Sequence, residues 1–464
     1  MNILWLIPPL EGFPNISQYR FFKRMPIRAT IIYPYLAASG VTLLNNAGHI
    51  VEFIDAPTLK MSQEKVDEKA AEANLIILEG RTPIMKEIWD QIWHLKYINK
   101  TVKIALYGDH VSWNPEESLR KGADFIIQGG DYDWGALKLA KHLENKNAGS
   151  GIIQAGLVQK LDELPWVDRE LVSWKPYFES WKTRDVFLWN MSMRGCYYRC
   201  VYCAWAGTCW DYKLRRRSPS SVAAETGFLH ITYGDFQYLD DADLFDTGWG
   251  VQYARELRRR GIGKSEVIWG IQTHPNMINN LEDLKEMKAA GLNLVKLGLE
   301  SGNQRSLDIM RKGLKIEQSE RAIRLLQEAD IGVHANLIVG FPWETKEEAY
   351  HTVEWIKKLK PNQAQFSLLI PYPNTELYQM AQKNKWLTVM DGDWGKFDAS
   401  KPMMKMADIS SQEITQLYQD SWRMFYLDRE FMWRQLKRVR SWSEVKQLYH
   451  GFRSVVYGHM RAVD

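Results

Sequence analysis

Short apolar runs alternate with longer amphipathic stretches over the first third of the chain. The runs have the length of buried strands, and stretches such as 35–47 and 83–98 have the spacing of helices. Strands that alternate with helices predict a doubly wound, parallel α/β sheet, whose ligands lie at the carboxyl ends of the strands. The expected strands of this first unit are 3–7, 51–54, 75–78, 102–107 and 125–127.

The expected strand ends of this unit carry turns that contain glycine, at 80–82, 108–112 and 129–133. Because glycine has no side chain, such turns let the backbone approach a flat or phosphate-bearing ligand closely. The pattern therefore predicts a ligand-binding edge near these turns.

A second alternating series begins near residue 186. Helical patterns separate its apolar runs, and the resulting series of strand–helix units predicts a partial (β/α)6 barrel. Chemistry in such barrels belongs at the carboxyl ends of the strands. The expected strands are 186–193, 236–240, 267–272, 294–299, 333–340 and 364–370, and the expected helices are 218–230, 249–260, 281–290, 317–329 and 345–359.

Shifts in composition divide the chain into four parts. Residues 1–140 form the first unit, and 141–184 form a linker rich in charge, glycine and proline. The barrel is expected at 185–384, and 385–464 is expected to be helical, with many aromatic and basic residues. Basic amphipathic helices lie on membranes, bind anionic substrates or form the solvated face of packed helices. Association with a membrane surface therefore stays open beside simple packing.

Composition narrows the class of protein. The 464 residues are 45% apolar and 25% charged, as in an ordinary globular protein, and the formal net charge of +4 does not indicate nucleic-acid binding. Residues 1–8 have no basic segment or cleavage site, and no apolar stretch is long enough to span a bilayer. With only four cysteines, three of them clustered, we expect a cytoplasmic protein whose thiolates bind metal.

That cysteine cluster, Cys196, Cys200 and Cys203, follows the first expected barrel strand directly. Three thiolates on one short loop can hold three irons of a cubane [4Fe-4S] cluster and leave the fourth iron open for a ligand. A zinc site that also uses Cys209 is an alternative, although zinc ligands usually come as two pairs separated by a longer loop. Disulfides within so tight a cluster would be strained.

The C-x3-C-x2-C spacing, with Tyr202 before the third cysteine, resembles the radical S-adenosylmethionine (radical SAM) superfamily. The resemblance implies that Cys196, Cys200 and Cys203 hold the cluster and that its open iron binds SAM. It further implies that one electron cleaves SAM to a 5′-deoxyadenosyl radical, which abstracts hydrogen from a substrate. Tyr202 would then lie near the adenine.

Motifs at later strand ends strengthen the resemblance. Residues 298–302, Gly-Leu-Glu-Ser-Gly, resemble the turn in which Glu300 and Ser301 would contact SAM. Residues 336–345 resemble the segment that packs on adenine, where Ile338 would supply apolar contact and Gly340 would allow close approach. The segment 371–378 matches a further family motif, with asparagine in place of one glycine.

Other candidates have ordinary structural interpretations beside the functional ones. Glu225 would orient SAM, or it is a surface carboxylate on a helix. Asp240 and Asp241 would bind substrate hydroxyls or move a proton as catalytic residues, or they cap a strand end. Gln272 is a candidate for contact with SAM or substrate.

The first unit resembles the cobalamin-binding domain that precedes many radical SAM domains. The chain lacks a D-x-H-x-x-G motif, so no histidine is offered as a lower cobalt ligand, and His110 is interpreted as a loop or capping residue. Asp131 and Asp133 stand where relatives commonly have a Gly-Glu-Gly-Glu-like turn. Both possibilities, bound cobalamin and an empty domain, stay open on this pattern.

The resemblance implies an enzyme of biosynthesis without naming its reaction. Methylation is expected if cobalamin binds, and rearrangement, dehydration or deoxygenation if it does not. A lipid, a sugar or another natural-product scaffold is the expected small-molecule substrate, and a flavodoxin- or ferredoxin-type protein the expected electron donor. The alternatives are a radical lipid-coupling or cyclisation enzyme at a membrane surface and a non-enzymatic zinc or iron–sulfur module.

Overall fold

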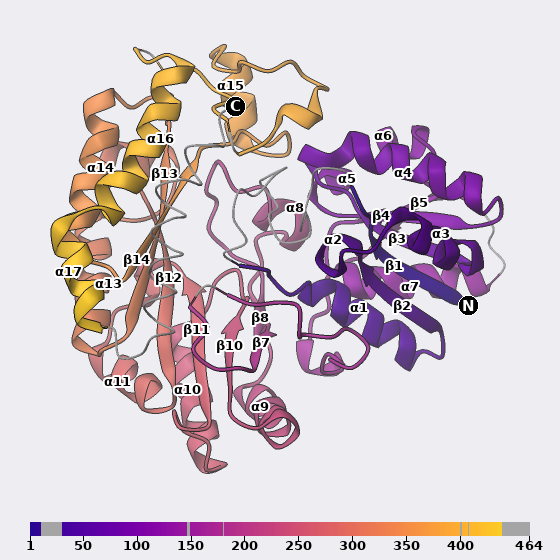
Figure 1. Ribbon diagram of the computed structural model, residues 1–464, viewed down its shortest axis with the longest axis horizontal. Helices are drawn as coiled ribbons and strands as arrows, with labels where there is room; N and C mark the ends of the chain where they lie inside the picture. Colours follow the sequence, from indigo (N-terminus) through magenta and orange to yellow (C-terminus); the bar gives the residue numbers. More distant parts are fainter. Residues whose placement is uncertain (11–29, 146–148, 180, 400, 407, 439–464) are drawn as a thin grey trace.

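The computed structural model describes residues 1–10, 30–145, 149–179, 181–399, 401–406 and 408–438. Two parallel six-stranded sheets and a set of C-terminal helices make up the described chain (Figure 1). The predicted α/β class, with a doubly wound first unit and a partial barrel after it, is confirmed. The predicted helical content of 439–464 lies outside the described residues.

The first sheet has the strand order β2-β1-β3-β4-β5-β6 with every pairing parallel. Helices cover both of its faces, with α4 and α6 above and α1 and α7 below in Figure 1. Its strands are β1 Asn2–Ile7, β2 Ile50–Asp55, β3 Leu75–Glu79, β4 Lys103–Tyr107, β5 Phe125–Gln128 and β6 Gly151–Gln154. Its helices are α1 Tyr35–Asn46, α2 Ala56–Leu59, α3 Gln63–Glu72, η2 Thr82–Ile84, α4 Met85–Ile98, α5 Asp109–Trp113, α6 Pro115–Arg120 and α7 Tyr132–Glu144.

One strand of this sheet, β6, lies inside the segment 141–184 that the sequence predicts as a linker. Its residues 151–154 pair in parallel with β5 at the sheet edge and are mostly half-exposed. Two apolar residues in a four-residue edge strand leave no periodic pattern to detect. The first unit therefore extends beyond residue 140, and the connecting segment begins after β6.

The second sheet has the order β7-β10-β11-β12-β13-β14, again all parallel, so each strand pairs with the next along the chain. Its strands are β7 Phe187–Asn190, β10 Phe236–Asp240, β11 Val267–Thr273, β12 Leu292–Glu300, β13 Gly332–Val339 and β14 Gln363–Leu368. The helices of this unit are α9 Pro219–Tyr233, α10 Thr247–Arg259, η4 Pro275–Met277, α11 Leu281–Ala289, α12 Gln304–Ile309, α13 Ile316–Glu328 and α14 Lys346–Leu359.

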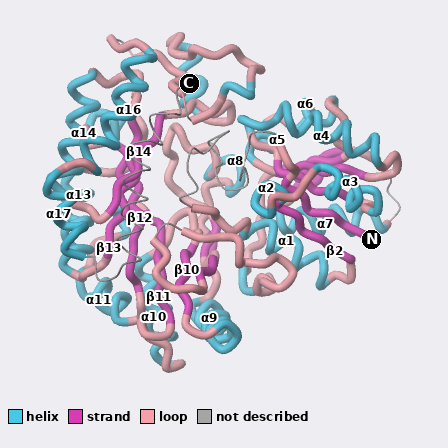
Figure 2. The backbone as a smooth tube through the Cα atoms, viewed as in Figure 1, coloured by secondary structure: helices cyan, strands magenta, loops and turns pink. Residues whose placement is uncertain are grey.

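Alternation along β13 shows how this half-barrel is built. Val333, Ala335, Leu337 and Val339 are buried, whereas the residues between them are only partly covered. In a strand, alternate residues point to opposite faces, so the buried set packs under the outer helices. Figure 2 shows those helices on the outer side of β12, β13 and β14, which leaves the inner face of the strands and their carboxyl ends to form the site.

Short elements connect the two units and close the chain. They are η3 Leu161–Glu163, β8 Met193–Arg194, α8 Ala206–Trp210, β9 Arg215–Arg216, α15 Glu376–Lys383, η5 Trp394–Lys396, α16 Ser411–Tyr426 and α17 Arg429–Arg438. Residues 384–410 are mostly loop with isolated bridges, at Leu387–Met404 and Met406–Ile409. The described part of the predicted helical region, 385–464, is thus α-helical only in α16 and α17, with the short 3-10 helix η5 before them. Among the described residues, no helix combines the length and the apolar character needed to cross a membrane.

Candidate active site

The cysteine loop begins at a glycine that no other residue could replace without strain. Gly195 follows β8 and has φ +98°, and an added Cβ would lie 2.0 Å from the carbonyl oxygen of Lys213. Its N–H donates to Asp243 Oδ2 at 3.0 Å. Asp243, which the sequence analysis did not single out, therefore holds the first residue of the loop in place.

Neighbouring turns anchor the rest of the loop. The N–H of Val201 donates to the carbonyl oxygen of Met310, and that of Cys203 donates to Cys200, both at 3.0 Å. The ring of Tyr198 stacks on that of His274, with centroids 3.9 Å apart. The loop is thus held against the turns that follow β11 and α12.

The three thiols are half-buried. Burial raises the pKa of all three, that of Cys196 to about 12, and the neighbouring thiols raise the pKa of Cys196 further. Metal binding therefore has to displace their protons. Three thiols on a backbone-anchored loop form a donor set that fits a [4Fe-4S] cluster.

In the described part of the chain, no three His, Cys, Asp or Glu side chains converge as ligands of one metal ion. Each thiolate of a cubane cluster binds a different iron atom. The cysteines of the loop therefore do not need to converge on one metal ion in order to hold such a cluster.

The fourth cysteine is held away from this donor set. Cys209 lies on α8, is buried, and contacts the hydroxyl of Tyr132 at 3.1 Å between Sγ and Oη. Its carbonyl oxygen accepts from the N–H of Gly130. Cys209 thus belongs to the contact between α8 and the first sheet.

Glu300 lies at the carboxyl end of β12 with its carboxylate beside the cysteine loop. Its Oε1 accepts a hydrogen bond at 2.8 Å from Lys312 Nζ, which also lies 3.4 Å from the hydroxyl of Tyr202. Glu300 has φ +67°, which is uncommon for a residue with a side chain. The structure thus brings together two predicted SAM-site residues, Tyr202 and Glu300, and adds Lys312, which sequence reasoning missed.

Ser301, the neighbour of Glu300, faces a different environment. Its hydroxyl donates to Glu344 Oε1 at 3.0 Å, and it is fully buried. Ser306 and Asn303 donate to the same carboxylate oxygen. These contacts fix the turn after β12, so Ser301 supports the position of Glu300 through the backbone.

Ile338 and Gly340 lie at the end of β13. Ile338 packs in the same apolar cluster as Val201 and Tyr202 of the cysteine loop. Gly340 has φ +88°, and an added Cβ would lie 3.3 Å from Ile414 on α16. Ile338 therefore lies beside the cysteine loop, and its predicted contact with adenine stays a prediction, whereas Gly340 packs near Ile414 of α16.

The two aspartates after β10 have separate environments. Asp240 is buried, and its Oδ1 accepts from the backbone N–H groups of Ser192 at 3.1 Å and Ala242 at 3.2 Å. Asp241 is partly exposed and accepts from Gln272 Nε2 at 3.3 Å. The contacts of Asp240 agree with its interpretation as a strand-end cap, and Asp241 and Gln272 form a polar pair at the open edge.

Burial raises the pKa of Asp240 to about 6. Because the folded protein then binds a proton that the unfolded chain releases, the free energy of unfolding falls as pH rises from about 4 to about 6. Asp240→Asn keeps the acceptor oxygen and removes the charge. In the wild type, this fall in the free energy of unfolding is at most about 3 kcal/mol. We expect urea unfolding at pH 5 and pH 8 to show no such fall in the variant. The same pH dependence in both proteins would contradict this assignment.

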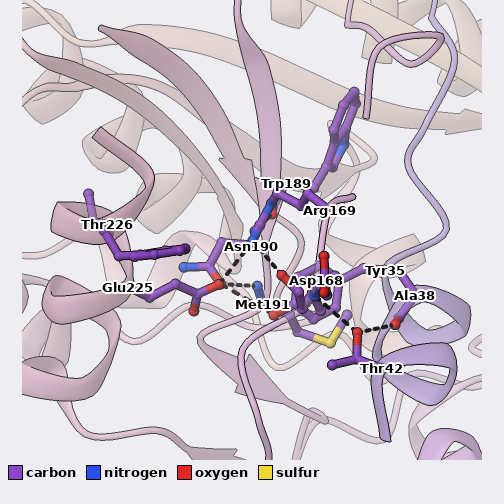
Figure 3. A network of polar contacts seen from close by, with 12 residues as sticks. Tyr35, Ala38, Thr42, Asp168, Arg169, Trp189, Asn190, Met191, Glu225 and Thr226 are labelled. Carbon is purple, nitrogen blue, oxygen red and sulfur yellow. Dashed lines mark hydrogen bonds and ion pairs between the residues drawn. The ribbon is translucent and has the colours of Figure 1, made fainter. Parts of the chain in front are cut away.

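Glu225 lies in a buried ion cluster. Arg169 donates to its Oε1 at 3.3 Å and Arg217 to its Oε2 at 2.6 Å. Arg217 and the hydroxyl of Tyr35 also reach Asn190 Oδ1. Figure 3 shows this network running from Glu225 through Asn190 to Tyr35 on α1. Arginines donate to both carboxylate oxygens of Glu225, which counts against the predicted contact with SAM. The side chain is also buried, so Glu225 is not a surface carboxylate.

Asp131 and Asp133, the residues at which the first unit departs from the cobalamin-domain pattern, bind the hairpin that carries the cysteine loop. Arg194 on β8 donates to Asp131 Oδ1 and Asp133 Oδ1 at 2.9 Å and to Asp133 Oδ2 at 2.7 Å. Arg215 on β9 donates to Asp131 at 2.5 and 3.0 Å. All four side chains are buried. These ion pairs connect the turn after β5 in the first sheet to Arg194, which lies two residues before Cys196.

His110 has partners on both ring nitrogens. Its Nδ1 lies 3.1 Å from the hydroxyl of Thr82, and its Nε2 lies 3.3 Å from Glu117 Oε2. The ring also packs edge-on against Trp394 of η5. His110 lies inside α5 and contacts the side chains of Thr82 and Glu117, so its interpretation as a loop or capping residue is wrong.

Comparisons with known proteins agree with this site. The family model described as the radical SAM superfamily matches residues 190–356. An uncharacterized methyltransferase of Pyrococcus horikoshii, PH0819, is 27% identical over 446 residues, which cover 92% of this chain and 93% of that protein. The anaerobic magnesium-protoporphyrin IX monomethyl ester cyclase of Cereibacter sphaeroides is 28% identical over 419 residues, 84% of this chain and 67% of that protein.

Among solved structures, that of the radical SAM methyltransferase TsrM from Kitasatospora setae, with cobalamin and a [4Fe-4S] cluster bound, has a TM-score of 0.69. The two chains are 15% identical, and the match covers 100% of this chain and 99% of that one. Residues 190–356, which hold the cysteine loop and the turn at Glu300, thus match the model of the radical SAM superfamily. This match implies a [4Fe-4S] cluster and SAM as cofactors.

Proposed function

We propose that this enzyme is a cobalamin-dependent radical SAM methyltransferase. The observation that carries the proposal is a buried ion-pair network formed by Asp131, Asp133 and Arg194. It connects the predicted ligand-binding edge of the first sheet to the β8–β9 hairpin that carries the cysteine loop. A methyl carrier in the first unit must reach the same substrate as the radical, and this junction keeps the two sites adjacent. The similarity to PH0819 along both units supports the same conclusion.

The chain's own residues divide the work of binding and orientation. When bound, the cluster and SAM supply the radical and cobalamin supplies the transferable methyl group. Cys196, Cys200 and Cys203 hold the cluster, and Tyr202 and Ile338 form an apolar surface beside it. Glu300 offers the carboxylate that orients SAM. The barrel excludes water and holds one substrate carbon near the reacting atoms.

If the first unit binds cobalamin, it would hold the cofactor through contacts other than the ring of His110. Both ring nitrogens of His110 are engaged with Thr82 and Glu117. The turn at Gly129 has φ +58°, and an added Cβ there would meet only one atom within 4 Å, the carbonyl oxygen of Thr208. The contacts available to a cofactor at this edge are therefore backbone and hydrogen-bonding contacts.

Cobalamin retention tests the proposal most directly. We expect anaerobically reconstituted enzyme to keep hydroxocobalamin through gel filtration, seen in its visible spectrum. With SAM and a strong reductant, it should form 5′-deoxyadenosine, together with S-adenosylhomocysteine that depends on cobalamin. Enzyme prepared without cobalamin is the control. Formation of 5′-deoxyadenosine without retained cobalamin and without S-adenosylhomocysteine would contradict methyl transfer and favour another radical outcome.

A further inference from the structure

The loop between α12 and α13 places a lysine ammonium next to the cysteine loop. Lys312 is buried, and its Nζ lies 2.8 Å from Glu300 Oε1 and 3.4 Å from the hydroxyl of Tyr202. Taking an ammonium out of water costs several kcal/mol unless other charges compensate for the loss of solvent. A buried lysine at this position is therefore expected to have an electrostatic role in addition to packing.

The backbone around Lys312 is fixed to the site. The carbonyl oxygen of Lys312 accepts from His274 Nε2 at 3.0 Å, and that of Met310 accepts from the N–H of Val201. The carbonyl oxygen of Gly313 accepts from Asn276 Nδ2 at 2.8 Å. Because both the cysteine loop and the turn after β11 hold this segment, the ammonium stays beside the cysteines.

Gly298 leaves the space that the pair of charges occupies. An added Cβ at this position would lie 2.7 Å from Glu300 Oε1 and 2.9 Å from Lys312 Nζ. A side chain at position 298 would therefore displace the ends of the Glu300 and Lys312 side chains from their present positions.

Both charges lie at the cysteine loop. Lys312 Nζ is 3.4 Å from the hydroxyl of Tyr202, the residue directly before Cys203, and 2.8 Å from Glu300 Oε1. The ammonium and the carboxylate are therefore both close to the loop that would hold the cluster.

We propose that Lys312 raises the reduction potential of the bound [4Fe-4S] cluster and that Glu300 lowers it. The proposal rests on the cluster that the match to the radical SAM superfamily implies, and it is independent of cobalamin and methyl transfer. It assigns Lys312 a tuning role beside the predicted role of Glu300 toward SAM.

The physical basis is the charge of the cluster. Three thiolates make the cluster anionic in its oxidised form, and one electron from the reductant adds a further negative charge without making or breaking a bond. Net charge and hydrogen bonding around a cluster set its potential. A buried cation beside the thiolates stabilises the reduced form, and a buried carboxylate opposes reduction.

Anaerobic redox titration with titanium(III) citrate, without SAM, measures this effect. We expect Lys312→Met to lower the equilibrium constant for reduction at least tenfold, a shift of about 59 mV toward negative potential for one electron. Glu300→Gln should shift the potential in the positive direction, and Lys312→Arg should stay near wild type. Lys285→Met, which removes a half-exposed lysine from the outer helix α11, is the matched control.

Each result decides the proposal. An unchanged potential in Lys312→Met with full iron and sulfide content would overturn it. Folded Lys312→Met that loads no cluster would also overturn it, because the lysine would then serve assembly. If Lys312→Met does not fold, Glu300→Gln decides by the presence or absence of its positive shift. Loss of methyl transfer alone, with these shifts intact, would refute only the proposed function.

Discussion

Cys203→Ala is expected to abolish 5′-deoxyadenosine formation, whereas Cys209→Ala is expected to leave it within a few-fold of wild type. The reason is their placement. Cys203 belongs to the backbone-anchored loop with Cys196 and Cys200, while Cys209 is buried on α8 against Tyr132. Removing one of three thiolates leaves an iron without its protein ligand. Iron, sulfide and 5′-deoxyadenosine, measured on anaerobically reconstituted protein, check both variants.

The comparison also separates the cluster from a four-cysteine zinc site. A zinc site would need Cys209 as much as Cys203, so both variants would lose metal together. Equal loss in the two variants, or zinc in place of iron in the wild type, would contradict the cluster assignment. A modest loss of stability in Cys209→Ala is expected in either case, because the substitution removes a buried hydrogen bond.

The strands of both sheets could be predicted because the signal for them is local. Parallel strands buried on both faces appear as continuous apolar runs, as at β3 and β4. The cysteine loop and the turn at Glu300 could also be predicted, because each is a contiguous motif after a strand. β6 could not be predicted, since this short edge strand is only partly buried and follows a polar stretch.

The residues that the sequence analysis missed act across long separations. Asp131 and Asp133 looked like a departure from the cobalamin-domain pattern, because their partner Arg194 lies in the other unit. A lysine after α12 gives no local signal of its position beside Cys200. Glu225 was singled out by its place after the cysteine loop, yet its carboxylate binds Arg217, eight residues before it, and Arg169, 56 residues before it. Contacts of this kind become visible only when the two sheets are assembled.

Arg194→Met is expected to destabilise the enzyme by about 3–5 kcal/mol, the usual cost of leaving a buried charge without its partner. Burial is the largest single influence on the pKa of Asp133 and raises it, but Arg194, together with hydrogen bonds from Ser39 and the N–H of Trp134, leaves that pKa lowered. Removing the guanidinium therefore leaves a desolvated carboxylate. Arg311→Met is the matched control, because it breaks an exposed pair with Glu376 and should cost at most about 1 kcal/mol. Urea unfolding, monitored by tryptophan fluorescence, compares them.

A double substitution shows whether the loss comes from the buried charge. In Arg194→Met/Asp133→Asn the side chain at 133 is neutral; its oxygen can still accept from the N–H of Trp134, and its amide NH2 can donate to the hydroxyl of Ser39, which donates to Asp133 in the wild type. We expect the double variant to be more stable than Arg194→Met alone, because the two residues are coupled. Equal stability would mean that Arg194 acts by packing. Since Arg194 precedes the cysteine loop by two residues, the single variant should also load less iron, and recovery of iron in the double variant would tie the junction of the two units to cluster assembly.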